Sequence, residues 1–148
     1  MTFLRRLSLI FLLALLPAAW LAAKGSEPIY RGAIIIDAAT GKVLFEDNAD
    51  HISPPASMTK LMTFLVVHDK IASGGLTLQT PVTVSAASSK IGGTQVWLKQ
   101  GETFPVEEML YALMIQSAND CAHALACAVA GTPEAFVELM NAKARAIG

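Results

Sequence analysis

The sequence lacks a strong net charge of either sign. Its 11 lysines and arginines nearly balance its 12 aspartates and glutamates, so the formal net charge is −1 at pH 7. No run of basic residues interrupts the chain. Because nucleic-acid-binding domains carry a basic patch or stripe that contacts phosphates, this balance argues against a nucleic acid as partner.

Cysteine and histidine are also scarce. Cys121 and Cys127 are the only two cysteines. Six positions apart on one helix, they would lie about 9 Å apart along the axis and on different faces, beyond the reach of a disulfide. We therefore expect buried free thiols. His51, His68 and His123 have no spacing typical of metal ligands, so we expect no metal site, and nothing in the sequence implies a cofactor.

The longest apolar run stands at the N-terminus. Arg5 and Arg6 precede the apolar stretch Leu7–Leu16, and the small residues Ala18–Ala23 follow. This order predicts a secretory signal peptide over residues 1–25. The uncharged run is slightly short for a comfortable membrane span, and an uncleaved signal anchor is the alternative. Either way we expect an exported chain, in the periplasm or at the outer face of the cytoplasmic membrane.

The remaining residues, 26–148, are too few for more than one domain. Two β-rich runs, 32–37 and 42–46, flank a turn that contains Gly41, which predicts a β-hairpin. The first run is apolar throughout, so we expect a strand covered on both faces and belonging to a larger sheet packed against helices.

Helical patterns dominate after residue 55. Apolar periodicity and end signals predict helices over about 56–73, 105–116, 120–130 and 132–146, the last with Thr132 as its N-cap. The sequence therefore predicts an α/β chain of the α+β kind, with an N-terminal β-hairpin and a mostly helical subdomain.

The stretch around Ser57 and Lys60 is the strongest candidate for chemistry. It follows Pro54 and Pro55, which disfavour helix just before it. Positions three apart share one helical face, so the Ser57 hydroxyl and the Lys60 amine can meet. An uncharged amine can accept the proton of a serine that attacks a carbonyl. The helix N-terminus would favour the developing oxyanion.

A plainer interpretation exists, because Ser-x-x-Lys is short enough to arise by chance as a surface serine and a solvated lysine. The residues after Lys60 are almost wholly apolar, which indicates a helix buried on most of its surface. A lysine at the start of such a helix favours the catalytic interpretation.

A second polar group, Ser117-Ala118-Asn119, lies between two apolar helices. In an extended link, residues two apart point the same way, so Ser117 and Asn119 could face one cleft. A hydroxyl there can relay a proton, and a carboxamide can hold a substrate amide or the lysine. The alternative is an ordinary helix stop followed by a helix capped by Asn119 or Asp120.

Together these motifs resemble the penicillin-recognising serine acyl-transferases, and most closely the low-molecular-mass D-alanyl-D-alanine carboxypeptidases of peptidase family S11. The stretch Pro55–Thr63 is similar to that family's nucleophile segment almost residue for residue. The stretch Asp37–Leu44 resembles its hairpin. The stretch Gln116–Asp120 resembles its second motif, where Gly is more usual than Ala118.

The resemblance implies a partial serine β-lactamase/transpeptidase-like domain and a set of roles. Ser57 would attack the carbonyl between two terminal D-alanines of a peptidoglycan pentapeptide and become an acyl-ester. Lys60 would be the general base, Ser117 a proton relay, and Asn119 would position the substrate or the lysine. β-Lactam antibiotics would act as covalent inhibitors, and no cofactor would be needed.

The family's third motif, Lys-Thr-Gly, is absent from the 148 residues. We therefore expect residues 26–148 to be the N-terminal part of a carboxypeptidase domain that lacks the later sheet strands, and to be inactive alone. A membrane anchor outside this chain stays open. Two other functions also stay open: a β-lactamase of the same fold, and a non-catalytic exported binding protein.

Overall fold

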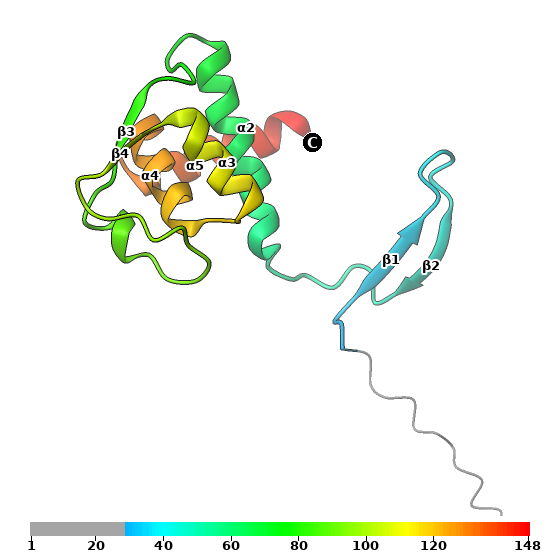
Figure 1. Cartoon of the computed structure of the whole chain (residues 1–148). Helices are drawn as coiled ribbons and strands as arrows, with labels where there is room; N and C mark the ends of the chain where they lie inside the picture. Colours follow the sequence, from blue (N-terminus) through cyan, green and yellow to red (C-terminus); the bar gives the residue numbers. More distant parts are fainter. Residues whose placement is uncertain (1–28) are drawn as a thin grey trace, which may run out of the picture. The chain divides into compact units, whose positions relative to one another are not determined.

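The computed structural model describes residues 29–148. The predicted signal peptide, residues 1–25, lies outside them. The chain divides into two compact units, residues 1–53 and residues 54–148. Figure 1 shows the elements of both units.

The first unit contains the predicted hairpin. Strand β1 (Ala33–Ile36) pairs antiparallel with β2 (Val43–Asp47), with a register shift between Ile35 and Ile36. The Asp37 carboxylate organises the turn by accepting hydrogen bonds from the backbone of Ala39 and from the backbone and hydroxyl of Thr40. The Thr40 hydroxyl contributes most to holding the pKa of Asp37 below its usual value. The hairpin prediction is therefore confirmed.

The expected burial of this hairpin is wrong for the described residues. Ile34, Ile35 and Ile36 are 54–55% exposed, and the side chains of β2 are exposed as well. Among residues 29–53 no third strand or helix is present to cover either face. The expected larger sheet is also absent from the described chain, which has two separate two-stranded sheets. An apolar run indicates surface that is suited to burial, but it does not say what buries it.

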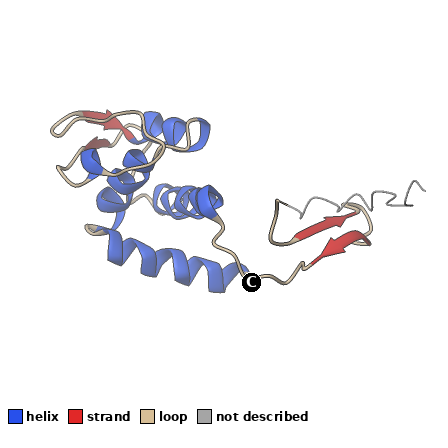
Figure 2. Cartoon of the chain, turned by 90° about the horizontal axis from the view of Figure 1, so that it is seen from below, coloured by secondary structure: helices blue, strands red, loops and turns tan. Residues whose placement is uncertain are grey.

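The second unit is mostly helical (Figure 2). Its elements, in chain order, are η1 (Ala56–Met58), α2 (Thr59–Ala72), β3 (Pro81–Thr83), η2 (Ser88–Lys90), β4 (Thr103–Pro105), α3 (Val106–Ile115), α4 (Asn119–Ala130) and α5 (Pro133–Ile147). The four predicted helices are confirmed with ends that differ by a few residues. The largest difference is at the first, which begins as a separate 3-10 turn before α2.

Helix α4 is the centre of this unit, because it contacts α2, α3, α5, η2 and β3. Its alanine-rich sequence lets neighbouring backbones approach closely. The largest buried apolar side chains come from all four helices and from the residues after β3; they are Phe136, Met109, Leu113, Leu125, Val67, Val84 and Val106. Helix α5 is capped as expected, since the Thr132 hydroxyl accepts a hydrogen bond from the Ala135 backbone at 3.2 Å.

Candidate active site

Ser57 and Lys60 lie where η1 passes into α2. The Lys60 Nζ is 3.4 Å from the Ser57 Oγ, which confirms that the three-residue spacing brings the two groups together. Ala56, just before the serine, has φ +48°, a conformation that alanine adopts at a cost. This turn exposes Ser57, and the hydrogen bonds of η1 do not use the Ser57 backbone N–H.

Asn119 joins this pair from the first turn of α4. Its Oδ1 accepts a hydrogen bond of 2.6 Å from Lys60 Nζ, although the two residues are 59 positions apart. Its Nδ2 donates to the Gly92 carbonyl at 2.8 Å, and its backbone N–H donates to the Thr94 carbonyl at 2.8 Å. Because the donor end of the carboxamide is held by a carbonyl, the oxygen end is directed at the amine. The amine therefore lies between the Ser57 hydroxyl and the Asn119 oxygen.

Ser117 does not join the group in the way we expected. The link between α3 and α4 is not extended, because Ser117 has φ +58° and forms the left-handed residue that ends α3. The Ala118 N–H turns back to the Ala112 carbonyl. No hydrogen bond of the Ser117 side chain to Ser57, Lys60 or Asn119 is present among the described residues.

The alternative interpretation of this segment is confirmed for the helix stop, because Ser117 ends α3, but it is wrong for the cap of the next helix. The N-cap residue of α4 is Ala118, whose side chain cannot cap. The Asn119 oxygen is taken by Lys60, as above. Asp120 is fully buried, and its carboxylate accepts hydrogen bonds from the backbone of Val96, Leu98 and Cys121. Both side chains thus bind other segments of the unit.

A pocket of about 530 Å³ opens over the Ser57–Lys60–Asn119 group. Its lining residues are Ala56, Ser57, Thr59, Lys60, Thr63, Ile91, Asn119, Ala122 and His123. Our sequence interpretation missed His123 as a residue of this site. The available signal was its position four residues after Asn119, which places both side chains on one face of α4.

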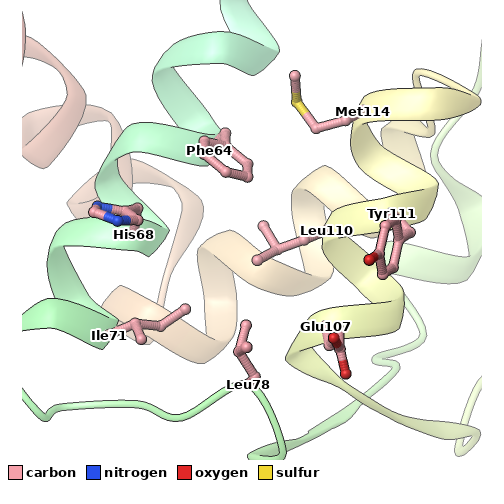
Figure 3. Close-up of a pocket in the computed structure, with 8 residues that line it drawn as sticks. All are labelled: Phe64, His68, Ile71, Leu78, Glu107, Leu110, Tyr111 and Met114. Atoms are coloured by element: carbon pink, nitrogen blue, oxygen red, sulfur yellow. The ribbon is translucent and has the colours of Figure 1, made fainter.

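A second pocket, of about 490 Å³, lies between α2 and α3 (Figure 3). Its walls are mainly apolar and come from Phe64, Ile71, Leu78, Leu110 and Met114. It contains none of the four residues proposed for chemistry. Its histidine, His68, stacks on Phe64 with ring centroids 6.4 Å apart. This pocket could therefore bind an apolar group, but its lining contains no nucleophile next to a base.

The cysteines are free thiols, as predicted, with Cys121 buried and Cys127 half-buried. Burial raises the pKa of the Cys121 thiol to about 12, and the Asp120 carboxylate adds to this shift. Burial also raises the pKa of Cys127, with a smaller effect of Glu134. Since the thiolate is the nucleophilic form, neither residue competes with Ser57 at neutral pH.

Within residues 29–148 no cluster of three or more histidines, cysteines or carboxylates lies close enough to hold a metal ion. None of the helices described there combines the length and hydropathy that crossing a bilayer requires.

Substitution of Gly93 tests the geometry around Asn119. Gly93 has φ +83°, and a Cβ there would lie 2.5 Å from Asn119 Nδ2. In the complete gene product, Gly93→Ala is expected to move the carboxamide away from Lys60 and to slow acylation of the Ser57 hydroxyl about tenfold or more. Gly101→Ala, also at positive φ but with open space around its Cβ, is the matched control. Equal rates for the two variants would contradict this account of Asn119.

Comparison with known proteins places this geometry in a family. The family model for D-alanyl-D-alanine carboxypeptidases matches residues 25–148. The carboxypeptidase DacF of Bacillus subtilis (strain 168) is 37% identical over 144 residues, which cover 94% of this chain and 37% of that protein. DacC of Escherichia coli (strain K12) is 40% identical over 124 residues, covering 80% of this chain and 31% of that one.

Solved structures agree with the sequence relatives. The carboxypeptidase DacD from Francisella tularensis superposes with a TM-score of 0.72 and 34% identity, over 82% of this chain and 30% of that one. Penicillin-binding protein D2 from Listeria monocytogenes, in its ampicillin-bound form, has a TM-score of 0.67 and 26% identity, over 82% of this chain and 49% of that one. The prediction of a partial transpeptidase-like fold is confirmed.

The chain spans 37% and 31% of the two sequence relatives and 30% and 49% of the two structures. It contains the nucleophile segment and the Ser-x-Asn segment of the predicted pattern, brought together at Lys60. Since the family model covers most of the chain, this protein belongs to the D-alanyl-D-alanine carboxypeptidase family, peptidase family S11.

Proposed function

We propose that this chain is the nucleophile-bearing part of a serine-type D-Ala-D-Ala carboxypeptidase, which removes the terminal D-alanine of peptidoglycan pentapeptides. The observation that carries the proposal is the position of the Lys60 amine, 3.4 Å from the Ser57 Oγ and 2.6 Å from the Asn119 Oδ1. A nucleophile, a base and a group that orients the base are the parts that activated serine chemistry requires.

In the acylation step Ser57 Oγ attacks the carbonyl carbon between the two D-alanines. Lys60 Nζ, in its uncharged form, accepts the hydroxyl proton as the new C–O bond forms. The C–N bond then breaks, and the leaving amine of D-alanine takes up a proton. The product is an ester on Ser57, which water hydrolyses to release the shortened peptide.

Charge on the attacked carbonyl oxygen needs hydrogen-bond donors. The Ser57 backbone N–H, at the N-terminus of α2 and outside the hydrogen bonds of η1, supplies one of them in this proposal. Asn119 holds the amine toward Ser57 and can also meet a substrate amide. Ser117 acts as the proton relay to the leaving amine, and its support is the Ser-x-Asn pattern alone.

β-Lactams enter the same proposal as covalent inhibitors. The Listeria relative was solved with ampicillin bound, and its TM-score to this chain is 0.67. Attack of Ser57 on a β-lactam carbonyl would open the ring and leave an ester in place of the natural acyl group. The proposed location is the periplasm or the outer face of the cytoplasmic membrane, supported by Arg5, Arg6 and the apolar run after them.

Labelling with a fluorescent penicillin tests this function. We expect the complete gene product to carry a label that is hydrolysed slowly enough to be isolated, and mass spectrometry of its peptides to find the adduct on Ser57. Ser57→Ala should remove the label, while Ser53→Ala, at an exposed serine four residues earlier, should keep it. A rapidly lost label would indicate a β-lactamase instead, and no label would indicate a binding protein.

A further inference from the structure

His123 is the second basic side chain of the pocket over Ser57. It lies one helical turn after Asn119 on α4, about 6 Å further along the axis. The pocket that it lines with Ser57 and Lys60 has a volume of about 530 Å³. A pocket of this size has room for a water molecule beside an ester on Ser57.

A chain of hydroxyl groups holds the imidazole. Ser88 is fully buried, and its Oγ lies 2.9 Å from His123 Nδ1 and 2.9 Å from Ser85 Oγ. The Ser88 backbone N–H also donates to Ser85 Oγ, at 3.0 Å. Two proton orders satisfy the contacts with the serines: Nδ1–H donates to Ser88 and the Ser88 O–H to Ser85, or the Ser85 O–H donates to Ser88 and the Ser88 O–H to Nδ1. Nδ1 also lies 3.8 Å from the Cys127 Sγ. A general base at Nε2 uses the first order, in which Nε2 carries no proton.

The free nitrogen of His123 is accessible. In the described part of the chain every buried side-chain nitrogen or oxygen has a hydrogen-bond partner. The structure gives Nε2 no partner, so Nε2 is not buried. The imidazole therefore lines the pocket with its Nδ1 held by Ser88 and its Nε2 without a partner.

The other residues of the pocket offer no better base for a water molecule. No aspartate or glutamate lines it, and Lys60 is the one further titratable side chain among its lining residues. The Lys60 amine is already engaged by Asn119 and Ser57. A β-lactamase interpretation would require a deacylating carboxylate in a loop beyond Asn119, whereas Glu134 and Glu138 lie on α5. An imidazole oriented by a third group is a common general base.

We propose that His123 activates the water that hydrolyses the acyl-ester on Ser57. The water oxygen bonds to the ester carbonyl carbon while Nε2 accepts one of its protons. The bond from that carbon to Ser57 Oγ then breaks, the imidazolium returns the proton to Oγ, and the peptide leaves as a carboxylic acid. Ser88 is a positioning residue, which fixes the ring through Nδ1. This inference rests on the proposed acyl-enzyme.

Separate measurement of acylation and deacylation tests the proposal in the complete gene product. With a fluorescent penicillin, His123→Ala is expected to lose its label about a hundredfold more slowly than the unchanged protein, at nearly the same labelling rate. His123→Gln, which keeps a polar contact for Ser88, should also lose its label slowly while its labelling rate stays nearly unchanged. Ser88→Ala should slow deacylation less, and His68→Ala, at the exposed histidine of α2, should change neither rate.

Added imidazole gives a readout that a purely structural role would not move. In His123→Ala it is expected to enter the vacated part of the pocket and to accelerate loss of the label, with no effect on the unchanged protein. Unaltered deacylation in His123→Ala, an equal loss of both rates, or no response to imidazole would each overturn the role of His123. Failure of the unchanged protein to label would instead overturn the proposed function.

Discussion

Lys60→Met in the complete gene product is expected to slow acylation by a penicillin about a thousandfold, because the Ser57 proton then has no acceptor within reach. Methionine has nearly the length of lysine and replaces its apolar stem, so α2 should still pack against the neighbouring helices. The second-order rate of labelling measures the effect. Lys70→Met, at an exposed lysine near the end of α2, is the matched control and should label normally.

Lys60→Arg separates proton transfer from charge. Arginine keeps a cation that can bind the Asn119 oxygen, but it does not give up its proton at accessible pH. We expect this variant to be nearly as slow as Lys60→Met. A labelling rate close to that of the unchanged protein would show that Lys60 supplies only positive charge, and would contradict its role as the base.

Asp120→Ala is expected to lower the free energy of unfolding by about 3–5 kcal/mol. Asp120 is fully buried, and its carboxylate accepts backbone hydrogen bonds of 3.0 Å from Leu98 and from Cys121 and one of 3.4 Å from Val96. Its removal leaves buried N–H groups without partners and a cavity beside them. Urea unfolding of the complete gene product, followed by circular dichroism, measures the loss.

Asp120→Asn is the informative partner variant, because it keeps one oxygen as acceptor while it removes the charge. We expect about half the loss of the alanine variant. Glu138→Ala, at an exposed position of α5, controls for the removal of a carboxylate and should change stability little. Equal stability of the Asp120→Ala and Glu138→Ala variants would show that the loop contacts of Asp120 contribute little to the free energy of unfolding.

The Asp120 contacts also connect stability to the active site. The loop they hold continues from the residues that bind Asn119, namely Gly92 and Thr94. Loosening residues 96–98 should therefore let the Asn119 carboxamide move away from Lys60. A folded fraction of Asp120→Asn that labels more slowly than the unchanged protein would agree with this connection.

Local patterns were sufficient for the parts of this protein that depend on near neighbours in sequence. The hairpin, the helices and the Thr132 cap were all predicted, as was the meeting of Ser57 with Lys60. The last follows from helical spacing alone, since residues three apart share a face whatever surrounds them. The resemblance to the carboxypeptidase family also depended on such short stretches.

Long-range packing decided the rest. The 2.6 Å contact of Lys60 with Asn119 joins residues 59 apart, and the contact of His123 with Ser88 joins residues 35 apart. Neither follows from a sequence period, because each depends on how α4 is placed against α2 and η2. The extended link expected at Ser117 was wrong because α3 ends in a left-handed turn. Within residues 29–53 no element covers the hairpin, because an apolar strand specifies a need for a partner surface but not which segment supplies it.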